Sequence, residues 1–343
     1  MPERYHRLRV SDVITETEDT CSLVFDIPAE LTERFRYRPG QFLTMQIPSA
    51  DRESVARCYS LASSPHTGEP LKVTVKRTIE GYASQWIHEH VHAGSVLEVL
   101  PPAGTFTPRA LDRDFLFLAA GSGITPVMSI ISSALAKGSG QLVLIYANRN
   151  EQSVIFAAQL AELVREQPDR FVAVHWLESL HGLPAEAGLR ALARPFTDHE
   201  AFICGPTPFM AAAMNALHGL GMPGTRVHAE RFHSLTENPF AAAPPTAAPA
   251  DGAVTTVEVA LNQEKHTIGW PAGQRLLDAL LAAGLDAPFS CREGKCGACA
   301  CVALDGTVTM NNNEVLDEQD LADGYILACQ SLPDSDSLTI SYE

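Results

Sequence analysis

Four cysteines toward the C-terminal end of the chain have the type and spacing of metal ligands. Three stand in the pattern C-x4-C-x2-C and a fourth follows later: Cys291, Cys296, Cys299 and Cys329. This is the ligand spacing of a plant-type [2Fe–2S] cluster, in which two irons bridged by sulfide take four thiolates. A zinc site would call for a second C-x2-C pair, whereas Cys329 stands alone. The pattern therefore predicts an iron–sulfur cluster, with zinc and disulfides as the alternatives.

The loop between these cysteines also contains two glycines and is followed by a fifth thiol. Gly294 and Gly297 would let the backbone close around the cluster and direct amide N–H groups toward the sulfurs. We interpret Cys301 as a packed or edge thiol, with substitution as a ligand as the alternative. A cluster of this kind only relays single electrons, so their source must lie earlier in the chain.

Two glycine turns at strand ends predict a dinucleotide site. The stretch "GSGITP" (Gly121–Pro126) follows an apolar run and leads into a predicted helix over 127–138. The stretch "CGP" (Cys204–Pro206) also ends a buried strand and begins a helix. Glycines there let a pyrophosphate approach a helix N-terminus, although Pro126 replaces the last glycine of the full G-x-G-x-x-G fingerprint.

A third motif lies upstream of these turns. "RCYS" (Arg57–Ser60) precedes a predicted strand over 71–78, and "GYAS" (Gly81–Ser84) opens a helical stretch. Its arginine could neutralise a phosphate, its aromatic ring could cover a planar cofactor, and its hydroxyl could bond the cofactor's edge. A glycine and serine at a helix start can bind an anion. Taken alone, the pattern also fits an ordinary surface strand.

The elements around the motifs predict two domains before residue 237. Short β-rich runs and turns over 1–110 indicate a small antiparallel β-barrel. Over 111–236, continuous apolar strands alternate with amphipathic helices, which indicates an α/β domain with a parallel sheet covered on both faces. Its predicted strands are 115–121, 142–148, 171–177 and 200–206.

An Ala/Pro-rich stretch, taken as a linker over 237–252, indicates a semi-rigid tether. The last domain, 253–343, is predicted to be α+β. It contains a hairpin over 255–270, a helix over 275–284 and the cysteine loop.

Charge and hydropathy exclude several classes of protein. The formal net charge of −16 argues against nucleic-acid binding. From Asp251 onward there are 15 acidic and 4 basic residues, a net −11. We interpret this as a solvated surface or as a docking face for a basic partner. No apolar run approaches the roughly 18 residues of a membrane helix, and the charged N-terminus has no signal core, so a soluble cytoplasmic protein is predicted.

One motif points elsewhere. "HEHVH" (His88–His92) matches the H-E-x-x-H pattern of zinc proteases. Because Ala93 and Gly94 follow directly, we expect the helix to stop there, and we favour a partly exposed, histidine-rich helix end over a zinc site.

Together these motifs carry a family resemblance. RxYS, GxxS, GxGITP and CGP, in this order, resemble the ferredoxin–NADP reductase superfamily, with its Rossmann-like nucleotide domain. With a C-terminal plant-type ferredoxin (β-grasp) domain, the chain resembles the reductase components of multicomponent oxygenases. The resemblance covers the whole chain except the tether. Within that family, the sequence is most similar to reductases that serve steroid hydroxylases. The second most similar group is the reductases of aryl-CoA metabolism.

The resemblance implies roles for individual residues of the first domain. Arg57 would meet the flavin pyrophosphate, Tyr59 would stack on the isoalloxazine, and Ser60 would contact its reactive N5 edge. FAD is implied rather than FMN because the "GYAS" turn is present. The other implied flavin residues are Cys58, Thr74, Val75, Lys76, Gly81, Tyr82, Ala83 and Ser84.

For the second domain, the resemblance implies that Cys204 lies beside the nicotinamide and, with Ser60, acts in catalysis. Phe232 falls where the family often places an aromatic or acidic group near the flavin. The implied nucleotide-binding residues are Gly121, Gly123, Thr125, Pro126, Cys204, Gly205 and Pro206.

The implied function is electron transfer from NADH through FAD and the [2Fe–2S] cluster to a separate terminal oxygenase, a Rieske or di-iron enzyme. The chain has no Cys-x-His pair for a Rieske centre, and substrate oxidation is expected on another chain. The alternatives are a stand-alone flavin reductase (diaphorase) and a non-enzymatic redox sensor. Arg149 could grip a 2′-phosphate, which leaves NADPH as the alternative donor.

Overall fold

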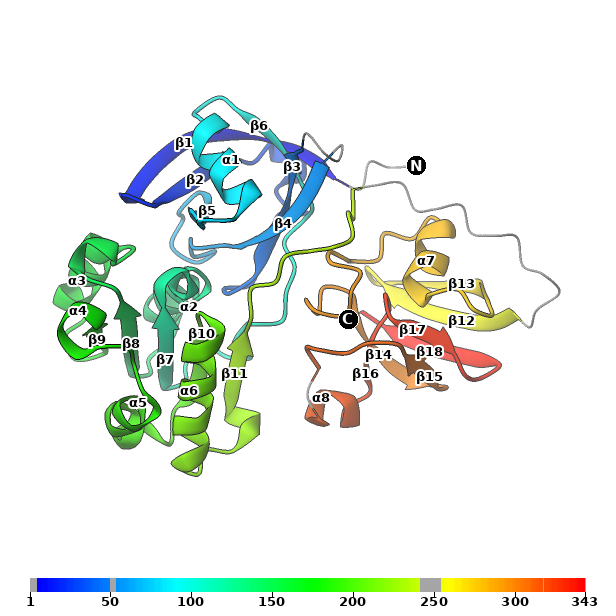
Figure 1. The fold of residues 1–343 in the computed structure, drawn as a ribbon. Coiled ribbons are helices and arrows are strands. Elements are labelled where there is room, and N and C mark those ends of the chain that lie inside the picture. Colours follow the sequence, from blue (N-terminus) through cyan, green and yellow to red (C-terminus); the bar gives the residue numbers. More distant parts are fainter. Residues whose placement is uncertain (1–4, 50–53, 241–253, 317, 343) are drawn as a thin grey trace.

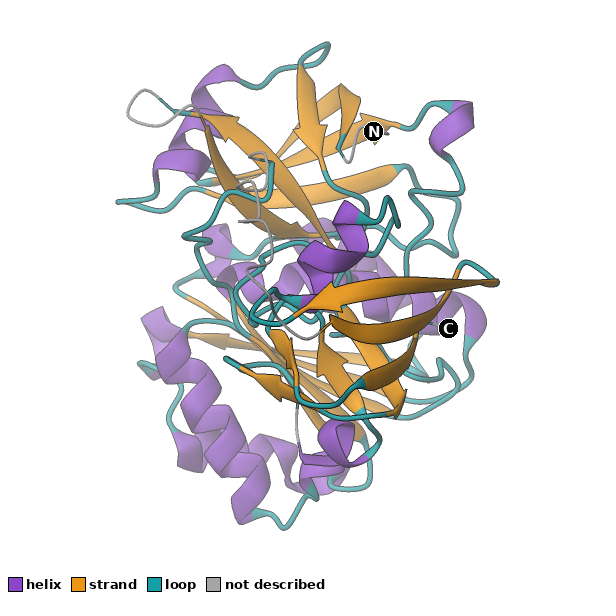
Figure 2. Cartoon of the chain, turned by 90° about the vertical axis from the view of Figure 1, so that its right-hand side faces the viewer, coloured by secondary structure: helices purple, strands orange, loops and turns teal. Residues whose placement is uncertain are grey.

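The computed structural model describes residues 5–49, 54–240, 254–316 and 318–342. Its strands form three separate main sheets, which divide the chain into three consecutive units (Figure 1). Seen from the side of the C-terminal unit, that unit lies in front of the boundary between the other two (Figure 2).

The first unit is an antiparallel barrel. Its sheet has the order β4-β3-β6-β1-β2-β5. A bridge between Leu61 and Val73 joins the end of β4 to β5 and closes the sheet on itself. The elements are β1 (His6–Thr17), β2 (Thr20–Asp26), β3 (Phe42–Pro48), β4 (Ser54–Ser60), β5 (Leu71–Lys76), β6 (Val96–Val99) and the helix α1 (Tyr82–His90).

The second unit is a parallel sheet of order β11-β10-β7-β8-β9. One face of the sheet packs against α2 and α3 and the other against α5 and α6, because its strands are apolar on both sides. The elements are β7 (Phe115–Ala120), α2 (Ile124–Lys137), β8 (Leu142–Asn148), α3 (Ala157–Glu166), β9 (Phe171–Leu177), α4 (Glu178–His181), α5 (Glu186–Ala193), β10 (Glu200–Cys204), α6 (Thr207–Gly219) and β11 (Val227–Glu230).

The third unit is a five-stranded mixed sheet, β13-β12-β18-β14-β16, with a small β15–β17 ribbon. Helix α7 packs on it around the buried Trp270. The elements are β12 (Val254–Leu261), β13 (Glu264–Pro271), α7 (Leu276–Ala282), β14 (Ala300–Asp305), β15 (Val308–Met310), α8 (Glu318–Ala322), β16 (Tyr325–Leu327), β17 (Ser331–Pro333) and β18 (Ser337–Ser341).

We call residues 231–240, the segment after β11, the strap. Its last residues belong to the predicted tether, but they contact the barrel. Asn238 Nδ2 donates to Ser54 Oγ at 2.8 Å, and the Phe240 ring lies 6.0 Å from that of Tyr5. The tether's start is therefore held against the barrel, because it carries an amide and an aromatic ring among its alanines and prolines. The remainder of the predicted tether, 241–252, lies outside the described residues.

Candidate redox site

The carboxyl ends of β7, β10 and β11 bring several predicted site residues together. In the parallel register Cys204 pairs with Ala119 on one side and with Glu230 on the other. Directly after β7, Gly121 has a φ of +53°, and the chain turns there into α2. This edge is where a dinucleotide binds in open α/β sheets.

The two glycine turns are packed against each other. A Cβ on Gly123 would lie 2.1 Å from the carbonyl oxygen of Cys204, and one on Gly205 would lie 3.0 Å from the Ala120 Cβ. Gly123 is thus required by the neighbouring backbone, in addition to any role facing a cofactor. In the first turn of α2, Thr125 Oγ1 donates to the Ser122 carbonyl at 3.0 Å, and Pro126 follows it.

Strand β4 of the barrel reaches this edge through Ser60. The Ser60 hydroxyl lies 3.5 Å from the Glu230 carboxylate, a long hydrogen bond that joins the first unit to the second. Burial raises the pKa of Glu230 to about 8, which the Ser60 contact only partly offsets. Burial also raises the pKa of the Cys204 thiol, and the nearby Glu230 carboxylate raises it further. At neutral pH the site therefore holds three uncharged groups that can donate a proton or a hydrogen bond.

Sequence reasoning did not single out Glu230. The available signal was an acidic residue at the carboxyl end of the last parallel strand, beside "CGP". Its neighbour Phe232, which was singled out, is half exposed on the strap.

The raised pKa of Glu230 predicts a measurable pH dependence. Because the folded-state pKa exceeds the reference value of 4.5, the stabilisation linked to Glu230 is complete below pH 4.5 and is lost as the pH rises through about 8. Between pH 6 and 9 we expect wild type to lose about 2–3 kcal/mol more unfolding free energy than Glu230→Gln in urea titrations. Infrared spectra should show a protonated carboxyl band at pH 7 that Glu230→Gln lacks. The exposed Glu162→Gln serves as the matched control, and a wild-type pH slope in Glu230→Gln would contradict the assignment.

The "RCYS" residues on β4 face different ways because side chains alternate along a strand. Tyr59 packs on the barrel core, while Cys58 packs beside Cys291 and Cys296. Cys58 Sγ lies 3.7 Å from Ser290 Oγ. Cys58 was predicted with the flavin group, but its side chain faces the third unit. Arg57 Nη1 donates to the backbone carbonyls of Ala56 and Leu235 at 2.7 and 3.3 Å.

On β5, Thr74 and Lys76 lie on the face opposite Val75, because side chains alternate along the strand. Thr74 bonds the buried Ser22 hydroxyl at 2.7 Å, and Val75 belongs to the core. Lys76 Nζ lies 3.8 Å from Asp19 Oδ2. A Cβ built on Gly121 would lie 3.7 Å from the same Lys76 Nζ. Lys76 therefore reaches the glycine turn of the second unit.

The "GYAS" turn is closed by its own side chains. Ser84 Oγ accepts from the Thr78 N–H at 3.1 Å and donates to the Gly81 carbonyl at 3.0 Å. Tyr82 is about half exposed and its hydroxyl donates to the Pro48 carbonyl, whereas Ala83 is buried. No side chain in the described ranges caps the N-terminus of α1, so first-turn N–H groups can meet a phosphate.

The cysteine loop brings its thiols together as two pairs. The Cys291 N–H points to Cys296 Sγ at 3.5 Å, and the Cys329 N–H points to Cys299 Sγ at 3.4 Å. A binuclear cluster needs two thiolates for each iron. Within the described parts of the chain, no three or more His, Cys, Asp or Glu residues gather around a single metal position. The pairing of the four thiols as two and two therefore fits a [2Fe–2S] cluster.

Backbone N–H groups also point at these sulfurs. The amides of Glu293 and Ala298 lie 3.3 and 3.5 Å from the sulfurs of Cys291 and Cys296. Gly294 and Gly297 adopt φ values of +78° and +69°, which only glycine adopts readily. The fifth cysteine, Cys301, lies on β14 within the hydrophobic core of this unit.

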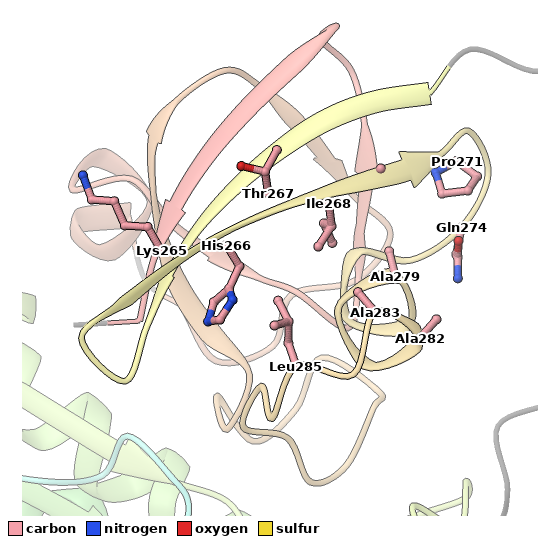
Figure 3. A pocket seen from close by; sticks show the side chains of 11 residues that line it. Lys265, His266, Thr267, Ile268, Pro271, Gln274, Ala279, Ala282, Ala283 and Leu285 are labelled. Carbon is pink, nitrogen blue, oxygen red and sulfur yellow. The ribbon is translucent and has the colours of Figure 1, made fainter. Parts of the chain in front are cut away.

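The "HEHVH" histidines do not share a helical face. Helix α1 ends at His90, so His92 lies beyond it. His88 Nε2 lies 3.0 Å from the Val75 carbonyl, and His92 Nδ1 lies 3.0 Å from the Ala93 carbonyl. A separate pocket of about 680 Å³ lies between β13 and α7, around His266 and Leu285, and contains none of the predicted site residues (Figure 3).

Family models place three cofactor domains along the chain. Residues 7–107 match an oxidoreductase FAD-binding domain, 117–215 an oxidoreductase NAD-binding domain, and 259–334 a 2Fe-2S iron-sulfur cluster binding domain. The chain is therefore an NAD(P)H-dependent flavin and iron–sulfur oxidoreductase. The predicted three-part fold and the cofactors FAD, NAD and [2Fe–2S] are confirmed.

The chain belongs to the family of ferredoxin reductase components of oxygenase systems. It is 55% identical over 337 residues to the ferredoxin reductase component of 3-ketosteroid-9-alpha-monooxygenase from Rhodococcus rhodochrous, covering 98% of this chain and 96% of the relative. It is 36% identical to a component of the 1,2-phenylacetyl-CoA epoxidase from Escherichia coli, with 99% and 98% covered. The solved phthalate dioxygenase reductase has the same fold, with a TM-score of 0.59 at 23% identity and 98% of each chain covered. None of the helices in the described ranges is both long and apolar enough to cross a membrane.

Proposed function

We propose that this chain takes electrons from NADH and passes them singly to a separate oxygenase that hydroxylates 3-ketosteroids. The 55% identity to a 3-ketosteroid-9-alpha-monooxygenase reductase over nearly its full length supports the steroid system. The observation that carries the electron route is the position of β4. Its Ser60 meets the nucleotide edge, while its Cys58 meets the cysteine loop. The predicted cytoplasmic location is kept as part of this proposal.

The residues of the chain bind, orient and insulate the cofactors. FAD accepts a hydride and can release its electrons one at a time, which suits a one-electron cluster. We assign Arg57 and the α1 N-terminus to the flavin phosphates, Tyr59 to its ring, and the Gly121 turn with Lys76 to the dinucleotide pyrophosphate. Ser60, Cys204 and Glu230 would hold the nicotinamide and the flavin edge together, with Glu230 keeping a proton at neutral pH. Cys291 with Cys296, and Cys299 with Cys329, would each hold one iron.

NADH is favoured over NADPH by an ion pair across the first two units. Arg149 follows β8, where it could meet a 2′-phosphate, but its Nη2 lies 2.6 Å from Asp19 Oδ2. Asp19 in turn accepts from the hydroxyls of Thr17 and Thr20, which fix its carboxylate. A phosphate at Arg149 would lie beside this carboxylate, and the two anions would repel each other.

Stopped-flow reduction of the cofactor-loaded protein tests the proposal. With NADH we expect the flavin absorbance to bleach first and the cluster absorbance to follow. With NADPH we expect at least about tenfold slower flavin reduction, the equivalent of about 1.4 kcal/mol. A flavin that bleaches while the cluster never follows would favour the diaphorase alternative. Full function of a flavin-free protein would favour the redox sensor.

A further inference from the structure

The cluster loop contains a buried carboxylate that is bonded to a different part of the chain. The Glu293 side chain is only 7% exposed. Its Oε1 accepts hydrogen bonds from the Thr236 N–H at 2.6 Å, the Thr236 hydroxyl at 2.8 Å and the Glu237 N–H at 2.8 Å. Its Oε2 accepts from Lys295 Nζ at 3.1 Å. Every donor to Oε1 thus comes from the strap.

The strap is held in turn by strand β4 of the barrel. The Leu235 carbonyl accepts from Arg57 Nη1 at 3.3 Å, and the Leu235 side chain is buried with Ala56 and Cys291. Further along the strap, the Asn238 amide donates to Ser54. The strap therefore lies between β4 and the cluster loop, and Glu293 joins it to the loop.

The other polar contacts of the third unit with this surface are weaker or more exposed. The Arg34–Asp286 pair, at 2.5 Å, and the Arg275–Glu237 pair, at 3.7 Å, join side chains that are one third to one half exposed. Such ion pairs contribute little because water and salt screen them. The Thr44–Ser290 contact at 2.6 Å is buried but uncharged. A buried carboxylate that accepts three donors forms stronger, charge-assisted bonds than any of these.

We propose that Glu293 is the latch that docks the iron–sulfur unit against β4. It is a positioning residue: it bonds the strap and thereby holds the cluster loop beside Cys58, on the strand that carries the flavin motif. Releasing Glu293 from Thr236 and Glu237 frees the cluster loop from the strap, which favours an undocked state. The proposal rests on the electron route proposed above, because a docked state is needed only if the cluster takes electrons from the flavin.

The thiol of Cys58 provides a readout of docking that does not depend on turnover. Cys58 is only partly exposed and faces the third unit, so its accessibility should rise when that unit moves away. In the cofactor-loaded protein we expect Glu293→Ala to increase the alkylation rate of Cys58, measured by peptide mass spectrometry, at least about fivefold. NADH-driven cluster reduction should slow by a similar factor, while flavin reduction keeps its wild-type rate.

Two further variants isolate the latch. Glu264→Gln removes an equally charged but exposed carboxylate of the same unit, on the β12–β13 hairpin, and should match wild type. Thr236→Val removes the hydroxyl donor from the strap without touching the cluster loop, and should raise Cys58 alkylation about twofold to threefold. If Glu293→Ala fails to assemble its cluster, Thr236→Val therefore still tests whether Glu293 docks the iron–sulfur unit.

The outcomes separate the latch from the electron route. Wild-type Cys58 alkylation in Glu293→Ala with its cofactors bound would overturn the latch, and so would wild-type alkylation in Thr236→Val. Slower cluster reduction without faster alkylation would also overturn it, since that pattern reports a local effect on the cluster. If NADH never reduces the wild-type cluster, the electron route fails, and Cys58 alkylation still decides whether Glu293 docks the unit.

Discussion

Cys299→Ala should yield a protein without its iron–sulfur cluster, whereas Cys301→Ala should keep it. Cys299 lies directly before β14 and Cys301 lies on that strand, and both thiols are buried. These two thiols and that of Cys329 all belong to the hydrophobic core of the third unit, but of the two only Cys299 is paired with another proposed ligand, Cys329. Because the cluster needs four thiolates, losing one should remove nearly all iron and sulfide from the purified protein.

The same two variants also distinguish electron transfer to the flavin from electron transfer through the cluster. Cys299→Ala should still reduce ferricyanide with NADH through its flavin but should pass no electrons to an oxygenase. Cys301→Ala should support both reactions with a stability loss of about 1 kcal/mol, the usual scale for a small cavity. Iron and sulfide analysis with visible spectra measures the outcome. A wild-type cluster in Cys299→Ala, or a lost cluster in a folded Cys301→Ala, would refute the ligand assignment.

Gly123→Ala should nearly abolish reduction of the flavin by NADH. The added methyl group would lie 2.1 Å from the Cys204 carbonyl oxygen and 2.7 Å from the Gly205 nitrogen, both of them backbone atoms. The turn before α2 must therefore move away from "CGP", which separates the groups proposed to hold the dinucleotide. A displacement of about 1 Å can lower a rate about 100-fold, and forced overpacking costs about 1–3 kcal/mol of stability.

Gly224→Ala is the matched control for this change. A Cβ at that position meets no atom within 4 Å of the described structure, and the backbone does not require glycine there. We expect Gly224→Ala to keep the wild-type rate of flavin reduction in stopped-flow measurements. Unchanged NADH kinetics in Gly123→Ala would mean that the close contact of the two turns has no role in nucleotide binding.

Local patterns predicted the parts of this protein that are formed by neighbouring residues. The three cysteines of the loop and the two glycines between them lie within a few residues, so their spacing is already the spacing of a site. The buried strands were found because both faces of a parallel sheet are covered, which makes each strand continuously apolar. The predicted strand over 142–148 coincides with β8, and the helix predicted from 127 begins one turn earlier because the glycine turn leads directly into it.

The parts that local patterns missed are contacts between residues far apart in the chain. Cys58 was grouped with its neighbours Arg57 and Tyr59, yet strand alternation turns it toward the third unit. Glu230 was passed over because its raised pKa depends on burial beside Ser60, which no sequence pattern displays. The Arg149–Asp19 pair likewise depends on how the first two units meet.

The amino-acid sequence alone was enough to establish the cofactor chemistry: thiolates for iron, glycine turns for a dinucleotide, and the order of three domains. These follow from residue type and short-range spacing, which covalent geometry sets before the chain folds. The packed fold was needed to show which side of β4 faces the cluster, which acid keeps its proton and which carboxylate joins the cluster loop to the strap. Each of these depends on burial and on the meeting of distant surfaces, and both arise only when the whole chain is packed.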